Sequence, residues 1–304
     1  MKPVIVLVHV GNVFVDYINE CILQIQKFND CSIYMVLSSQ HFNKINGEVN
    51  LIGIEDLPLC ENHLNFLSTS ERDSNFRDGF WKSVVERFYI IEDVIKAYKL
   101  EHVFHFENDN MIYCKLEEVL DVLAQKNIMS AAPFDNDMRC IPSFVYFKNQ
   151  EVLSKLNQFM FLYPNLNDME LIALFNKEYN LIEMLPLIPA NYDLKLQSKS
   201  GLTVENEQKY KSNFNLFHSV FDAAAIGQYL GGVDSRNVKF NFLKRILKRK
   251  SNFVNESAVY DVRQFSYHWE EDQSGRKIPY LNYKGENIKI NNLHIHSKKL
   301  KDFR

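Results

Sequence analysis

Alternation between apolar runs and a helical repeat at the start of the chain most constrains the fold. Lys2–Val10 is almost continuously apolar and ends at Gly11, which is typical of a buried parallel strand. Val13–Phe28 then repeats apolar residues every three or four positions, which predicts a helix, and Ser32–Leu37 follows as a second predicted strand. Gly53–Leu57 is a short third candidate. Strand–helix–strand order predicts an α/β fold.

The pattern continues to about residue 185. Phe80–Tyr98 has the clearest helical repeat, and the apolar stretch His102–Phe106 follows it as a predicted strand. Further predicted elements are a helix at Leu116–Leu123, strands at Ile128–Pro133 and Ile141–Phe147, a helix capped by Asn167–Glu170 and running to Tyr179, long loops in Leu187–Phe217, and a short helix at Phe221–Leu230. We find no internal repeat and no Gly/Ser-rich or Pro-rich linker, so residues 1–304 are predicted to form one domain with an irregular second half.

Charge and segment composition exclude several classes of protein. The 35 Lys and Arg residues face 38 Asp and Glu residues, for a net charge of −3, which disfavours nucleic-acid binding by bulk charge. The apolar start is too short for a transmembrane helix and lacks the features of a signal peptide, so we expect a cytoplasmic protein. The five cysteines include no CxxC pair and are expected to be reduced thiols.

An acidic turn directly after the predicted strand at 102–106 is the strongest local signal. Glu107 and Asp109 flank Asn108 at what would be the carboxyl edge of the sheet, where α/β proteins bind ligands. Two acids there suit a hard divalent cation, which prefers oxygen ligands. The alternative is an ordinary polar turn.

Arg87 is the second candidate, because it lies on the flank of the buried stripe of the helix at 80–98. A buried guanidinium needs a partner. A phosphate group fits its bidentate geometry, and a structural ion pair with a nearby carboxylate is the equal alternative.

The end of the chain supplies a third candidate. In an extended segment His294, His296 and Lys298 share one face, while Leu293 and Ile295 share the other and would dock the segment. Imidazole can complete the coordination of a metal, and the lysine can neutralise phosphate. The alternative is an exposed tail.

In the order and type of these elements the chain resembles nucleotide-sugar-dependent glycosyltransferases of the GT-A fold. The acidic motif at 107–109 stands where those enzymes carry D-x-D, with glutamate in place of the first aspartate. Arg87 matches the arginine that they place one helix earlier, near the donor. His296 with Lys298 resembles their C-terminal metal-binding histidine and diphosphate-binding lysine, at a shorter spacing than in the glycogenin-like families.

The resemblance implies a mixed, mostly parallel sheet with a Rossmann-like nucleotide-sugar-binding half at 1–150 and an acceptor half at 151–304. It also implies Mn²⁺ or Mg²⁺ at Glu107, Asp109 and His296, with His294 as the alternative histidine ligand. The donor would be a UDP- or GDP-sugar, and the acceptor a glycan or lipid-linked glycan. The predicted donor-binding residues are Arg87, Asn108, Lys298 and, beside the nucleoside at the end of the first strand, His9, Gly11 and Asn12.

Two further features have alternative interpretations. Asp222 faces the sugar or acceptor as a catalytic residue, or only caps the start of the predicted helix together with Ser219. The basic stretch Lys239–Lys250 contacts an anionic membrane surface or a lipid-linked acceptor, or is a solvated face packed through its apolar side.

The sequence thus predicts a metal-assisted transferase of hexose or pentose units. Whether transfer inverts or retains the configuration is left open. The rival hypotheses are a metal-dependent phosphohydrolase or nuclease built on the same acids, and a catalytically inactive carbohydrate-binding module.

Overall fold

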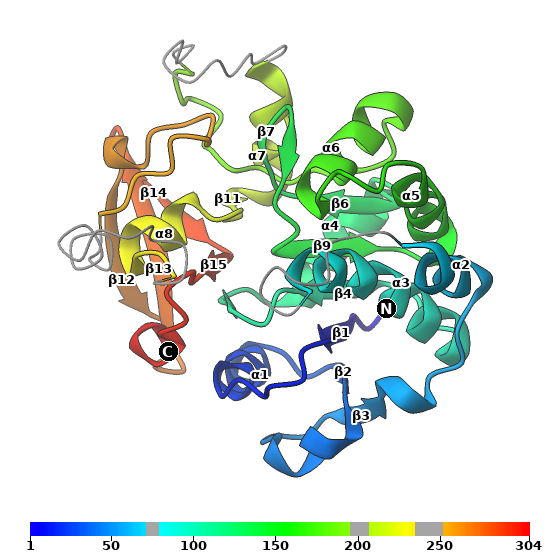
Figure 1. The fold of residues 1–304 in the computed structure, drawn as a ribbon. Helices are drawn as coiled ribbons and strands as arrows, with labels where there is room; N and C mark the ends of the chain where they lie inside the picture. The colour runs from blue at the N-terminus through cyan, green and yellow to red at the C-terminus, as the bar shows by residue number, and fades with distance from the viewer. Residues whose placement is uncertain (71–78, 195–206, 235–251) are drawn as a thin grey trace, which may run out of the picture.

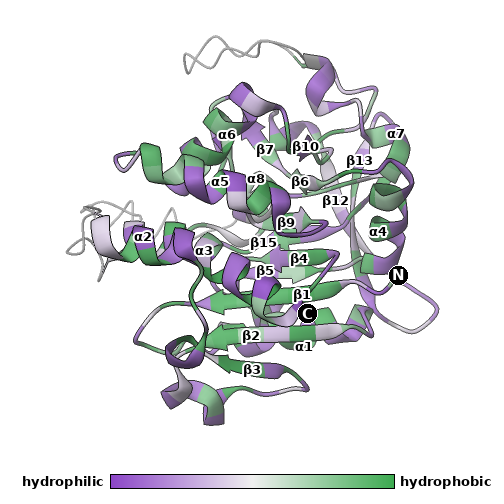
Figure 2. Cartoon of the chain, turned by 90° about the vertical axis from the view of Figure 1, so that its right-hand side faces the viewer, coloured by the Kyte–Doolittle hydropathy of each residue, from purple (hydrophilic) through white to green (hydrophobic). Residues whose placement is uncertain are grey.

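The computed structural model describes residues 1–70, 79–194, 207–234 and 252–304. Seven strands form its central sheet, and Figure 2 shows them stacked edge to edge. Every neighbouring pair is parallel except the two made by β9, which is antiparallel to both β4 and β6. The predicted mixed, mostly parallel sheet flanked by helices is therefore confirmed. The strand order is β10 (Glu183–Met184), β6 (Ser130–Ala132), β9 (Phe144–Phe147), β4 (Val103–Phe106), β1 (Val4–His9), β2 (Ser32–Leu37) and β3 (Asn50–Gly53).

The chain reverses its direction of travel through the sheet between β1 and β4. It runs from β1 through α1 (Tyr17–Phe28) to β2 and β3, and then returns through α3 (Phe80–Tyr98) to β4 on the other side of β1. Because the connections leave the carboxyl ends of β1 and β4 in opposite directions, this point is a topological switch, where open α/β sheets bind ligands. A ligand is therefore expected beside the residues that follow β1 and β4.

Helices α2, α3, α5 and α6 gather at one side of the molecule, away from the small C-terminal sheet (Figure 1). The predicted helix at 80–98 coincides with α3, and the predicted capping box opens α6, with Asn167 and Glu170 bonded to each other's backbone amides. Helices α2 and α5 have no counterpart in the sequence predictions. The remaining bounds are α2 (Glu61–Thr69), α4 (Leu116–Gln125), α5 (Gln150–Leu162), α6 (Asp168–Tyr179), α7 (Phe214–Phe217) and α8 (Ala225–Gly231), with short 3₁₀ helices at Ser39–Lys44, Ile54–Asp56, Glu207–Tyr210, Val262–Gln264 and Leu300–Phe303.

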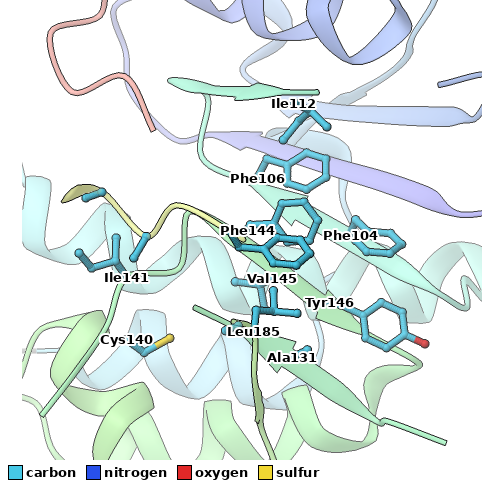
Figure 3. Packing of buried hydrophobic residues seen from close by; sticks show 14 of the residues in the cluster. Phe104, Phe106, Ile112, Ala131, Cys140, Ile141, Phe144, Val145, Tyr146 and Leu185 are labelled. Carbon is cyan, nitrogen blue, oxygen red and sulfur yellow. The ribbon is translucent and has the colours of Figure 1, made fainter. Parts of the chain in front are cut away.

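Aromatic side chains from β4 and β9 fill the centre of the core (Figure 3). Phe104 packs on Tyr146 with ring centroids 5.1 Å apart, and Phe106 packs on Phe144 at 4.8 Å. All four side chains are fully buried, and each such burial contributes about 1.5–3 kcal/mol. This packing holds β4 firmly up to the residue before Glu107.

The C-terminal region forms a second sheet, and the chain then returns to the acidic turn at residues 107–109. Its strands lie in the order β11 (Ser219–Val220), β14 (Glu286–Ile290), β13 (Lys277–Tyr283) and β12 (Ser266–Glu271). The last strand, β15 (Asn292–His294), pairs antiparallel with β5 (Asn110–Ile112), so that His294 lies opposite Asn110. Leu293 and Ile295 are fully buried, and the predicted docking of this segment is confirmed. A hairpin of β7 (Phe134–Asn136) and β8 (Arg139–Cys140) completes the strands.

Two predicted elements lie elsewhere than expected. The third strand is Asn50–Gly53, not Gly53–Leu57, because Gly53 pairs with Leu37, the last residue of β2, and leaves no partner for the residues beyond. The helix expected from Phe221 begins only at Ala225.

Two sequence predictions concern contact with a membrane. Among the described residues every helix is too short or too polar to cross a bilayer. The basic stretch Lys239–Lys250 lies outside the described residues.

Candidate metal and phosphate site

Glu107, Asp109 and His294 converge at the carboxyl end of β4. The Nε2 atom of His294 lies 3.1 Å from Glu107 Oε2 and 3.1 Å from Asp109 Oδ2. One ligand atom from each residue lies within 4.8 Å of the others, a spacing that can hold a metal ion. The acids come from the turn after β4, and the pairing of β15 with β5 brings the histidine to them.

The orientation of the His294 ring requires a cation beside these acids. Its Nδ1 atom lies 2.9 Å from the carbonyl oxygen of Ala223 and donates to it, so a neutral ring would point the Nε2 lone pair at two carboxylates. Burial alone would lower the pKa of His294, but Asp109 and Glu107 outweigh it and raise the pKa to about 9. A proton or a metal ion must therefore occupy the space at Nε2.

The donor set fits a hard or borderline divalent cation such as Mn²⁺ or Mg²⁺. Two carboxylates supply oxygen ligands and one imidazole supplies nitrogen. The hydrogen bond from Nδ1 to a backbone carbonyl is the outer-shell contact that usually fixes a metal-binding histidine.

Cationic side chains border the same acids. Lys298 forms an ion pair with Asp109, and Arg87 bridges Glu107 at 2.5 Å and Asp168 at 2.6 Å. The ion-pair alternative for Arg87 is thus what the structure contains. Three carboxylates and two cations leave one negative charge when His294 is neutral. A divalent cation would offset this charge and that of the Asp222 carboxylate, which contacts the backbone amide of His294.

His296 lies next to this group but does not face the carboxylates in the same way. Its ring centroid is 5.1 Å from that of His294, and its buried Nδ1 has no hydrogen-bond partner among the described residues. Burial lowers the pKa of His296 to about 4, so the ring is neutral at pH 7. Its predicted role as metal ligand remains a prediction, and His294, the alternative, occupies the place between the acids.

The predicted nucleoside-binding residues lie together where β1 ends, at the switch point. His9 Nε2 is 3.0 Å from the carbonyl oxygen of Val13, and His41 contacts the carbonyl oxygen of Asn12 at 3.0 Å. A Cβ atom at Gly11 would lie 3.0 Å from the His9 ring, so glycine leaves room here.

Asn108 connects β4 to β1 at the same point. Its Nδ2 donates to the carbonyl oxygen of Val8 at 2.9 Å, while its buried Oδ1 has no hydrogen-bond partner within the described part of the chain. An amide oxygen in that state is an open acceptor for a ligand.

Asp222 is completely buried and its carboxylate is occupied by backbone amides. It accepts hydrogen bonds from Ile226 at 2.9 Å and Gly227 at 2.8 Å, and from the amide of His294 at 3.0 Å. Asp222 therefore binds both the first amides of α8 and the backbone of His294. Ser219 belongs to β11 and takes no part in a capping box. The catalytic role of Asp222 stays a prediction, and these contacts support a positioning role.

Two carboxylates of the site were not singled out from the sequence. Asp168 is the first residue of α6 and pairs with Arg87; its only sequence signal was its place inside the capping motif. Asp135, on β7, is completely buried, and neither carboxylate oxygen has a hydrogen-bond partner among the residues described. Burial raises the pKa of Asp135 to about 6, and the nearest cation, Arg139, lies 3.7 Å away. Asp135 is followed by Asn136 and Asp137, the same acid–x–acid spacing as Glu107 and Asp109, and this spacing is the signal that could have found it.

Comparison with known proteins finds similarity in structure only. No protein-family model matches the chain, and no curated protein sequence matches it. Among solved structures, mouse xyloside xylosyltransferase 1 in its apo form has a TM-score of 0.43 and 7% identity, over 61% of this chain and 86% of the other. Galactosyltransferase LgtC, solved with donor and acceptor sugar analogues, has a TM-score of 0.39 and 10% identity, over 60% and 73%.

A third match is the glycosyltransferase GlyE of Streptococcus pneumoniae, at a TM-score of 0.39 and 12% identity, over 60% of this chain and 45% of the other. All three are glycosyltransferases. At TM-scores below 0.5 these similarities carry no argument for this chain, and its chemistry follows from the side chains of the site.

Proposed function

We propose that the protein is a metal-assisted glycosyltransferase that moves a hexose or pentose from a nucleoside-diphosphate sugar to a glycan or lipid-linked glycan. The observation that carries the proposal is the convergence of His294 Nε2 on Glu107 and Asp109, with Lys298 paired to the same aspartate. When bound, Mn²⁺ or Mg²⁺ would offset the charge of the leaving diphosphate.

The loop after β15 supplies the groups for the diphosphate. The buried Nδ1 of His296 and the hydroxyl of Ser297 have no partner among the described residues, and the ammonium of Lys298 follows them. Three consecutive residues with such groups would bind phosphate oxygens through hydrogen bonds and the lysine charge. Arg87 would support the same region by holding Glu107 and Asp168 in place.

The nucleoside and the sugar would occupy opposite sides of the cation. Asn108, with its open amide oxygen, and the group at His9, Gly11 and Asn12 lie at the switch point, where the nucleoside is expected. Asp135 has a buried carboxylate without hydrogen bonds, and a sugar hydroxyl would satisfy it. In this proposal residues 1–150 form the nucleotide-sugar-binding half, and residues 151–304 bind the acceptor and supply the C-terminal element for the metal and the diphosphate.

Titration calorimetry with UDP and GDP, each with and without Mn²⁺, tests the proposal. We expect one nucleotide to bind much more tightly with Mn²⁺, and a mass-spectrometric acceptor screen with nucleotide sugars to yield a glycosylated product. If neither nucleotide binds under either condition, the proposal is wrong. Release of inorganic phosphate from simple esters would favour a phosphohydrolase, and binding without turnover of any donor would favour an inactive module.

A further inference from the structure

A small uncharged pocket lies between α2 and α5, apart from the candidate metal site. It has a volume of about 110 Å³, and no ionisable side chain lines it. The lining residues are three asparagines, one glutamine and one phenylalanine: Asn62, Asn65, Asn157, Gln158 and Phe161. A pocket of amides and one aromatic ring offers hydrogen bonds and an apolar surface without charge.

A buried carboxylate beneath the pocket fixes the direction of two of these amides. Glu92 is completely buried and accepts hydrogen bonds from Asn62 Nδ2 at 3.1 Å and Asn157 Nδ2 at 2.7 Å. Lys96, at 2.5 Å, balances its charge. Because the NH₂ groups are held by Glu92, the carbonyl oxygens of both amides are directed away from it.

One of these carbonyl oxygens is left unsatisfied. Asn157 is completely buried, and its Oδ1 has no hydrogen-bond partner among the described residues. A buried acceptor without a partner is costly, and a ligand with a hydroxyl or amide donor would remove that cost. Because Asn157 is also one of the lining residues, a ligand that donates hydrogen bonds is the kind that fits the pocket.

One wall of the pocket is apolar and exposed. Phe161, which lines the pocket, is 45% exposed although it lies beside the amides. An aromatic face beside amide acceptors matches a sugar ring, which has C–H groups on its faces and hydroxyl donors at its edge.

From these contacts we propose that the pocket binds one uncharged pyranose unit of a glycan. The pocket shares no lining residue with the metal site formed by Glu107, Asp109 and His294. Binding here needs neither metal nor nucleotide, so it does not depend on the proposed transfer. If the transfer is also correct, the pocket would anchor the acceptor away from the reacting centre.

Saturation-transfer NMR with glucose, galactose, mannose and N-acetylglucosamine, on the full chain without metal or nucleotide, tests this site. We expect at least one of these sugars to bind, and Phe161→Ala to weaken that binding about tenfold, since the ring contributes the stacking surface. Leu162→Ala is the matched control, because Leu162 is the exposed neighbour and does not line the pocket. Gln158→Ala changes another exposed lining residue and should also weaken binding without affecting the fold.

Three results would overturn the proposal: no sugar binds, Phe161→Ala and Gln158→Ala bind as the unchanged protein does, or the charged sugars glucosamine and glucuronate bind more tightly than glucose. Binding of UDP with Mn²⁺ should be the same in Phe161→Ala and in the unchanged protein. A protein that binds sugar here but no nucleotide would therefore separate this site from the failure of the proposed transfer.

Discussion

Two histidines of this protein are buried between pairs of carboxylates, yet only one of them is arranged to bind a metal. His63 on α2 lies 2.5 Å from Asp93 through Nδ1, and 3.8 Å from Glu86 through Nε2. His294 instead gives Nδ1 to a backbone carbonyl and turns Nε2 to both Glu107 and Asp109.

The difference lies in which ring nitrogen meets the acids. Around His63 the carboxylates lie at opposite nitrogens, so no single cation can contact all three groups, and Asp93 is further tied to the backbone amide of Cys60 at 2.7 Å. Around His294 both acids face the same nitrogen, Nε2, so one cation can contact all three groups. The pKa of both histidines is raised to about 9, so a shifted pKa does not separate a structural histidine from a metal ligand, whereas geometry does.

The largest effect should come from Asp109→Asn. Asp109 contacts both His294 and Lys298, and the amide would remove an anionic ligand from the cation. We expect transfer to fall by more than about 1,000-fold, as is common when a catalytic metal loses a ligand and its electrostatic support. Turnover measured with saturating donor and Mn²⁺ checks this.

Asp121→Asn is the matched control, since Asp121 is an exposed acid on α4. Circular dichroism should show that both variants keep the fold. Near-normal turnover by Asp109→Asn would remove the metal role from this aspartate.

Replacing each histidine by alanine should separate the two regions. We expect His294→Ala to weaken Mn²⁺ binding by more than about 100-fold, because even outer-shell changes cost 10–100-fold. His63→Ala should leave Mn²⁺ affinity unchanged but lower the free energy of unfolding by about 3 kcal/mol, because it leaves Asp93 buried without its partner. Calorimetry and urea unfolding measure the two quantities, and equal metal affinities in the two variants would contradict the comparison.

Stability of the metal-free protein should fall as the pH rises. The folded-state pKa of His294, about 9, lies above its ordinary value of 6.5, so its contribution is fully present below pH 6.5 and is lost as the pH rises through 9. Its size is roughly 3 kcal/mol. Saturating Mn²⁺ replaces the proton at Nε2 and should remove this part of the pH dependence, whereas the part due to His63 should remain.

The proton and Mn²⁺ compete for Nε2 of His294. Mn²⁺ affinity should therefore rise up to about tenfold per pH unit between pH 6.5 and 8. Thermal unfolding at several pH values, with and without metal, gives both slopes. An affinity that does not change over this range would show that no proton leaves Nε2 on binding.

A smaller effect is expected from Asp222→Asn. The amide cannot accept from all three backbone N–H groups that now hold it, so His294 would be less firmly placed. We expect about tenfold weaker Mn²⁺ binding. If Asp222 is instead the catalytic residue predicted from the sequence, turnover should fall far more than metal affinity, and measuring both distinguishes the two roles.

The sequence predicts the fold well where local pattern and packing agree. The apolar run at β1 is visible because its four central residues, on both faces, are buried. The repeat of α3 is visible because nearly every residue from Val85 to Ile95 is buried. Helix α2 was not predicted, since it buries only His63 and Phe66, too few residues to show a period. Helix α5 does bury apolar residues at helical spacing, so its repeat is present in the sequence and was missed.

The site was predicted only where residues lie close in sequence. Glu107 and Asp109 follow one strand and are visible together, but the choice between His294 and His296 depends on the register of β15 against β5, which no local pattern encodes. Asp168 joins the region through its ion pair with Arg87, that is, through tertiary packing alone. Sequence spacing therefore identifies the acids, and only the assembled sheet identifies the histidine.

The central claim, that His294 shares one cation with Glu107 and Asp109, is tested most directly by pulsed electron paramagnetic resonance of the Mn²⁺-loaded protein. We predict nitrogen couplings from one imidazole that are kept in His296→Ala and lost in His294→Ala. Couplings that survive in His294→Ala, or vanish in His296→Ala, would contradict the account.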